Sequence, residues 1–151
     1  MRMIVDPAAL PIPPDFKFRF QVEGERAGGF AADPGQAVLV YGSGRDVNRP
    51  LMIAFGSRDD VALIGTHGHA GTRIKIVNGT VTALYHDGMW KPGAGRSQKR
   101  IGETLIHWDS ADVHSLTIGG LPDGRKIGIR GARSLGVSLG QLVRIADHLA
   151  P

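Results

Sequence analysis

Residues 72–85 have the sequence Thr-Arg-Ile-Lys-Ile-Val-Asn-Gly-Thr-Val-Thr-Ala-Leu-Tyr. On both sides of the Asn-Gly pair, polar and apolar residues alternate, which is the period of a strand with one buried face. Asn78-Gly79 favours a two-residue turn because both positions of that turn require positive φ, which Asn and Gly tolerate. The stretch therefore predicts a β-hairpin, and with it an antiparallel sheet.

Further short apolar or alternating runs extend the β pattern along the chain. They are residues 16–20, 37–42, 50–55, 61–64, 102–108, 113–118 and 126–130. We expect residues 102–108 and 113–118 to form a second hairpin, and residues 87–100 to be a polar, glycine-rich connection. The period of two also predicts that Phe16, Phe18 and Phe20 share one face of their strand.

Only the C-terminal segment has a helical period. Ser138 and Gln141 have capping-box spacing, and the apolar residues after the cap recur at steps of three and four between Leu139 and Leu149. A lone helix of this length is marginal in water, so we expect it to dock on the sheet. The predicted fold is α+β and mainly β: a curved, half-barrel-like antiparallel sheet of eight or nine strands, with the C-terminal helix packed on it.

Length and composition indicate one domain. The chain has 151 residues with 22 glycines, nine prolines and no cysteine. The absence of cysteine excludes disulfides, thiolate zinc sites and a cysteine nucleophile. Prolines at 7, 11, 13 and 14 predict that residues 1–15 are a Pro-rich linker or extended N-terminus. Residues 16–151 are then the single β-rich domain.

The charge is unevenly distributed. Residues 1–70 carry seven Lys/Arg against eight Asp/Glu, whereas residues 71–151 carry eleven against six. The excess centres on a segment with Lys91, Arg96, Lys99 and Arg100, which we interpret as a basic loop and a place where a partner would bind. Nucleic acid is not expected, because aromatic residues are too sparse for a stacking platform.

Histidines supply the candidates for catalysis or metal binding. His67 and His69 would point the same way on a strand and share a metal, and His107 and His114 flank a predicted turn. The sequence has neither a G-x-S-x-G elbow nor a convincingly spaced carboxylate pair. We therefore favour a non-enzymatic protein without a cofactor, with a His-dependent hydrolase or metal-dependent enzyme as the alternative.

The order of features after residue 72 resembles a known family. The features are residues 72–79, Ala83-Leu-Tyr-His-Asp-Gly88, Thr104-Leu-Ile-His-Trp108, Lys126-Ile-Gly-Ile-Arg-Gly131 and Leu139-Gly-Gln-Leu-Val-Arg-Ile-Ala-Asp-His-Leu149. They resemble the extracytoplasmic domain of unknown function of bacterial, especially actinobacterial, proteins that carry an anti-sigma-factor zinc finger and a membrane helix. That domain is similar to the lipoprotein-carrier (LolA-like) and sigma-E-regulator (RseB-like) fold.

The resemblance implies a sensory or ligand-binding domain of a membrane-associated regulator. An apolar small molecule or lipid would then lie between sheet and helix, against Leu105, Trp108, Leu142 and Ile145. A module for protein interaction or homodimerisation, acting through an exposed strand edge, is a further alternative. No run approaches the roughly 20 apolar residues of a membrane span. We expect an extracytoplasmic domain if the chain is tethered in a longer protein, and a cytoplasmic one if Met1 is the true start.

Overall fold

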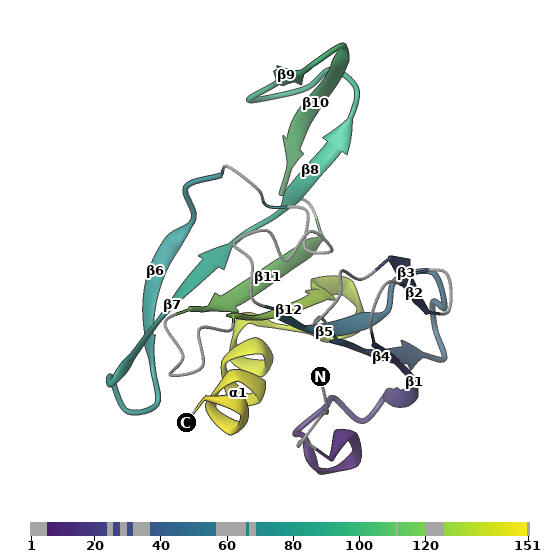
Figure 1. The fold of residues 1–151 in the computed structure, drawn as a ribbon, viewed down its shortest axis with the longest axis vertical. Coiled ribbons are helices and arrows are strands. Elements are labelled where there is room, and N and C mark those ends of the chain that lie inside the picture. The colour runs from purple at the N-terminus through teal and green to yellow at the C-terminus, as the bar shows by residue number, and fades with distance from the viewer. Residues whose placement is uncertain are drawn as a thin grey trace.

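The structure is a computed structural model that describes residues 6–23, 26–27, 30–31, 37–56, 66, 69–110, 112–119 and 126–150. Its main element is a seven-stranded antiparallel sheet (Figure 1). The strands lie in the order β1 (Phe16–Glu23), β4 (Ala37–Ser43), β5 (Leu51–Gly56), β12 (Lys126–Ala132), β11 (Val113–Ile118), β7 (Val81–His86) and β6 (Thr72–Ile76). The sheet is open, with β1 and β6 at its edges.

A second sheet of three strands projects beyond the main sheet, and we call it the arm (Figure 1). Its order is β8 (Met89–Pro92), β10 (Thr104–Asp109) and β9 (Lys99–Ile101). The short strands β2 (Arg26–Ala27) and β3 (Phe30–Ala31) pair separately. The expected class, mainly β with a C-terminal helix on the sheet, is confirmed, and the strands are divided between sheets.

The hairpin of residues 72–85 is confirmed. β6 and β7 pair antiparallel up to Ile76 and Val81, and Asn78 and Gly79 have φ of 54° and 83°. Val77 also has positive φ, at 51°. Its N–H donates to an Asp147 carboxylate oxygen at 2.9 Å, which links the turn to the C-terminal helix.

The predicted helix is also confirmed, as α1 (Leu139–Leu149). The Ser138 hydroxyl accepts a hydrogen bond from the Gln141 N–H at 3.2 Å, as an N-cap should. Leu142, Ile145 and Ala146 are fully buried against one face of the main sheet. A 3-10 turn, η3 (Arg133–Leu135), connects β12 to the helix.

The second predicted hairpin is wrong. Residues 104–109 pair with β8 and β9 in the arm, whereas residues 113–118 pair with β7 and β12. Gly88 permits this route, because a Cβ there would lie 2.1 Å from the Asp109 carbonyl oxygen, and only glycine allows the two chains to cross so closely. Residues 87–100, expected to be a loop, therefore contain β8 and the first two residues of β9. The strand predicted at 61–64 lies outside the described residues.

The N-terminal segment lies against the core from Asp6 onward. It forms a 3-10 turn, η1 (Pro7–Ala9), and Leu10 and Ile12 pack on the buried cluster. The Tyr41 hydroxyl donates to the Pro7 carbonyl oxygen at 2.7 Å. Burial, reinforced by the Asp6 carboxylate, raises the pKa of Tyr41 to about 12, so the hydroxyl keeps the proton that it donates.

Candidate functional site

A β-bulge in β1 places two consecutive side chains on one face of the sheet. Phe18 pairs with Tyr41, but Phe20 pairs with Val40, so that Arg19 is the extra residue. A bulge of this kind re-aims the residues that follow it. The expectation that Phe16, Phe18 and Phe20 share a face is therefore wrong for Phe20, which joins Arg19 on the face opposite α1. We call this the helix-free face.

Gly42 makes room for the Arg19 side chain on the helix-free face. A Cβ at Gly42 would lie 2.4 Å from Cδ of Arg19 and 3.2 Å from one of its guanidinium nitrogens. The Arg19 stem therefore lies directly over the β4 backbone. Any larger residue at position 42 has to push Arg19 aside.

Arg130 approaches the same region from the centre of the sheet. The register of β12 pairs Arg130 with Met52 on one side and with Ser115 on the other, both on the helix-free face. Its neighbour Ile129 is fully buried on the α1 face. Arg130 itself is half-buried, and this burial lowers the pKa of its guanidinium. Because an arginine remains a cation in proteins, the sheet holds a partly desolvated positive charge here.

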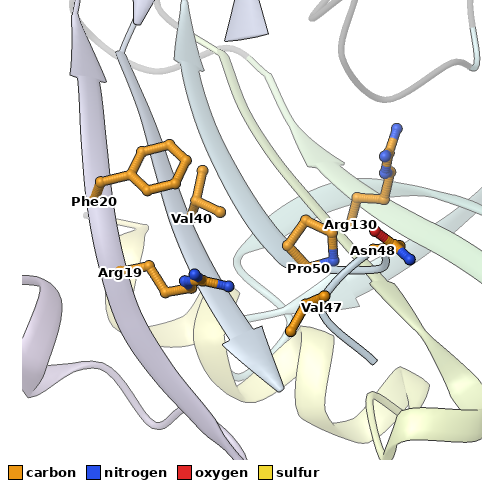
Figure 2. Close-up of a pocket in the computed structure, with 7 residues that line it drawn as sticks. All are labelled: Arg19, Phe20, Val40, Val47, Asn48, Pro50 and Arg130. Carbon is orange, nitrogen blue, oxygen red and sulfur yellow. The ribbon is translucent and has the colours of Figure 1, made fainter. Parts of the chain in front are cut away.

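Arg19 and Arg130 flank a pocket of about 300 Å³, which we call the arginine pocket (Figure 2). Arg19 and Phe20 stand on one side of it, with Val40 beside them, and Arg130 stands on the other (Figure 2). Its remaining described lining residues are Val47, Asn48 and Pro50, from the segment between β4 and β5. The pocket thus combines two guanidinium groups and one amide with an apolar wall.

This combination suits a small anion with an apolar body. A guanidinium presents a planar fork of N–H donors that matches carboxylate geometry, and its stem contributes apolar surface. An amide adds a donor and an acceptor that can fix orientation. The volume lies at the small end of the range for ligand pockets, which is roughly 300–1,000 Å³.

The apolar site expected between sheet and helix is not formed by the residues predicted for it. Leu142 and Ile145 have no exposed surface, because they are packed inside the core. Leu105 and Trp108 lie on β10 in the arm, which belongs to another sheet. The structure therefore does not bring the four residues together. The helix covers core side chains there.

Trp108 belongs instead to an aromatic cluster at the base of the arm. The His69 ring stacks on Trp108, with centroids 3.5 Å apart, and Trp90 meets Trp108 edge to face at 5.2 Å. The Trp108 indole N–H donates to an Asp87 carboxylate oxygen at 3.0 Å. Burial, followed by the neighbouring His86, lowers the pKa of His69. These contacts stabilise the junction of arm and main sheet.

The four basic residues predicted as a loop site are distributed over the arm. Lys91 forms an ion pair with Asp109 at 2.7 Å, and the Lys99 ammonium lies 4.3 Å from the Trp90 ring centroid. Arg96 and Arg100 are exposed. Two of the four cations therefore have a structural partner within the arm, and the other two face solvent.

The candidate histidines do not converge. His107 contacts the Gly93 carbonyl oxygen through Nδ1 at 3.0 Å in the arm, while His114 is buried beneath α1 between Tyr85 and Val137. His69 lies in the aromatic cluster, and His67 lies outside the described residues. Within the part of the chain that the structure describes, no group of three or more His, Asp or Glu side chains could hold a metal ion.

Comparison of the chain with protein-family models, with curated proteins and with solved structures finds no significant match. Among the described residues, no helix has the length and apolar character that crossing a bilayer would require.

Sequence reasoning missed the arginine pocket, although one signal for it was present. Arg130 interrupts the otherwise apolar run Ile127-Gly-Ile-Arg130-Gly131, and a cation in a central strand calls for a partner or a ligand. Arg19 carried no such signal, because its position follows from the bulge. A strict alternation would have placed it on the opposite face from Phe20.

Proposed function

We propose that the protein is a non-enzymatic ligand-binding domain that holds a small amphiphilic anion in the arginine pocket. The observation that carries this proposal is the pair of guanidinium groups, Arg19 and Arg130, on either side of a cavity whose wall is otherwise largely apolar. Burial around Arg130 strengthens its attraction for an anion, because charges interact more strongly where water is excluded.

The ligand class that fits is a monocarboxylate with a short aliphatic or aromatic body. The carboxylate would pair with the Arg19 guanidinium, which extends toward Val47 and Pro50, while Arg130 adds positive charge on the far side of the pocket (Figure 2). The body would lie against Phe20, Val40 and Pro50. A neutral analogue of the same shape would keep the apolar contact but lose the charge-assisted hydrogen bonds. Those bonds contribute about 1.5–3 kcal/mol each when a charged group takes part.

The sensory role is part of the same proposal and draws on the resemblance of residues 72–149 to the extracytoplasmic domain family. A domain of that kind would report the presence of its ligand to a membrane-associated regulator. Arg19 and Phe20 lie on an edge strand, so ligand contact would alter the edge of the sheet at which a partner would bind.

Calorimetric titration with benzoate and hexanoate tests the proposal, with benzamide and hexanamide as neutral controls. We expect saturable binding of the acids and at least tenfold weaker binding of the amides. Arg19→Gln should weaken benzoate binding by roughly tenfold, as the loss of one charge-assisted bond predicts. Arg19 is exposed, so the variant should retain the fold.

Lys17→Gln is the matched control, because Lys17 is an exposed cation two residues away on β1 that does not line the pocket. It should leave benzoate affinity within twofold of the unmodified protein. Equal effects of Arg19→Gln and Lys17→Gln, or equal affinity for benzoate and benzamide, would contradict the proposed site.

A further inference from the structure

A second pocket lies on the helix-free face, near the opposite edge of the main sheet. It has a volume of about 340 Å³. Its described lining comes from β6, β7, β11 and β12, from the residue after β11 and from the segment before β6. The residues are Ala70, Arg73, Thr82, Ala83, Leu84, Thr117, Gly119 and Lys126. We call it the edge pocket.

The strand register explains why these polar side chains gather there. Arg73 pairs with Leu84, and Leu84 pairs with Thr117, so the three form one row across β6, β7 and β11. Lys75 pairs with Thr82 in the next row on the same face. Both rows point away from α1, because the alternate residues of these strands, such as Ala83 and Ile118, are buried in the core.

Three cations surround the edge pocket. Arg73 and Lys126 line it, and the Lys75 ammonium donates to the Thr82 hydroxyl at 2.6 Å. Among the residues that the structure describes, neither Arg73 nor Lys75 forms an ion pair with a carboxylate. The positive charge of β6 is therefore not balanced within that part of the chain.

We infer that the edge pocket binds a phosphate-type oxyanion, such as the head of a phosphomonoester. A tetrahedral dianion accepts several hydrogen bonds at once, and it suits a guanidinium fork combined with ammonium groups. The Thr117 hydroxyl adds a donor. The Thr82 oxygen already accepts from Lys75, so its O–H points its proton elsewhere and is available to the ligand.

The chemistry differs from that of the arginine pocket, and so does the position. Lys126 and Arg130 are four residues apart on β12, which corresponds to about 13 Å along a strand. The edge pocket has two threonines and three cations around it, where the arginine pocket has a largely apolar wall. Substitutions in one pocket should therefore leave the other intact.

Titration of the full chain with inorganic phosphate and with glycerol 3-phosphate tests this inference. Both should bind saturably, and acetate, a monoanion, should bind at least tenfold more weakly. Arg73→Gln combined with Lys126→Gln should weaken phosphate binding by roughly 100-fold, and Thr117→Val by roughly threefold to tenfold. Arg144→Gln, an exposed position on α1, is the matched control and should have no effect.

The natural source of the phosphate group is distinguished by a vesicle arm of the same experiment. Sedimentation with phosphatidylcholine vesicles containing 20% phosphatidic acid, against pure phosphatidylcholine, reports a lipid head group. Binding of glycerol 3-phosphate without binding to the vesicles indicates a soluble ligand, and vesicle binding that Arg73→Gln abolishes indicates the head group. The inference is overturned if the unmodified protein binds neither the soluble phosphates nor the vesicles. It is also overturned if the Arg73→Gln/Lys126→Gln double variant binds phosphate as tightly as Arg144→Gln does.

Discussion

The buried ring of His114 shows how one residue ties α1 to the sheet. Its Nε2 faces the Val137 carbonyl oxygen, which can only accept, so Nε2 carries the proton. Nδ1 is then the acceptor for the Tyr85 hydroxyl at 2.8 Å, and Tyr85 in turn accepts from Arg133 at 3.0 Å. A second proton on the ring would make Nδ1 a donor and leave the Tyr85 O–H without its acceptor.

The protonation of His114 should make the fold sensitive to acid. Burial, with a smaller contribution from Arg133, lowers its pKa below 6.5, although the bond to Val137 and the Asp112 carboxylate oppose this. The unfolded chain therefore binds a proton at this histidine near pH 6.5, whereas the folded chain binds it only at lower pH. The free energy of unfolding therefore keeps its full value above pH 6.5. It falls as the pH drops from 6.5 through the lowered pKa of His114 in the folded state. His69, whose pKa is also lowered, has the same sign.

Urea denaturation between pH 8 and pH 5 measures this loss. His114→Gln should flatten the dependence of unfolding free energy on pH, even though it lowers stability at pH 8 by about 1–3 kcal/mol through lost buried hydrogen bonds. His148→Gln, at an exposed position on α1, should leave the slope unchanged. An identical slope in His114→Gln and the unmodified protein would contradict the assignment.

Gly42 offers a test of the arginine pocket that keeps both guanidinium groups. Gly42→Ala places a methyl group where the Arg19 stem now lies, 2.4 Å from Cδ. Arg19 is a flexible, exposed side chain, so the fold should tolerate the change and the guanidinium should move. We expect benzoate affinity to fall several-fold with little change in melting temperature. Gly44→Ala, where an added Cβ meets nothing within 4 Å, is the control.

At the scale of elements, Arg133 connects the arm to the main sheet. Its guanidinium donates to the Asp87 carbonyl oxygen at 2.8 Å, just before β8, and to the Ser110 carbonyl oxygen at 3.1 Å, just after β10. Both chains that enter the arm are therefore held by one side chain from η3. The aromatic cluster around Trp108 supports the same junction from the arm side.

Arg133→Ala should loosen the arm while leaving the helix in place. We expect amide hydrogen exchange in β8 and β10 to accelerate by roughly tenfold or more, because about 1.5–3 kcal/mol of charge-assisted hydrogen bonding is lost at the junction. Amides of α1 should exchange as before. Uniform acceleration over the whole chain would show that Arg133 stabilises the fold globally. Unchanged exchange in the arm would show that the Arg133 hydrogen bonds to Asp87 and Ser110 are not needed to hold it.

The local elements were predictable where the sequence pattern is itself local. Asn78-Gly79 specifies a turn, and Ser138 with its apolar stripe specifies a capped helix. The partners of β10 were not predictable, because nothing between Asp109 and Val113 shows that the chain leaves one sheet for another. That crossing depends on the close approach of Gly88 to Asp109, which is a long-range contact.

The candidate site was harder to predict than the fold for a related reason. Trp108 and Leu142 each have the character of buried residues, but alternation and period do not say which buried residues meet. Arg19 acquires its position from a one-residue bulge, and a single-residue shift moves every later side chain of a strand to the other face. Both pockets arise from register across several strands, which no single stretch of sequence contains.

At the scale of the whole molecule, the two faces of the main sheet differ in the side chains that they carry. One face packs against α1 through the apolar core and gives the fold its stability. The other carries Arg19 near the β1 edge, Arg130 and Lys126 on the central strand β12, and Arg73 and Lys75 on the edge strand β6. Other side chains of the helix-free face, such as Val38, Met52 and Ser115, are buried, so we expect ligands to reach this face at the two pockets.

Backbone amide shifts of the ¹⁵N-labelled full chain during a benzoate titration test ligand binding in the arginine pocket most directly. We predict saturable shifts that are largest at Arg19, Phe20, Val40, Asn48 and Arg130, with α1 and the arm little changed. Largest shifts at Leu142 or Trp108, or shifts that never saturate, would contradict the proposed site.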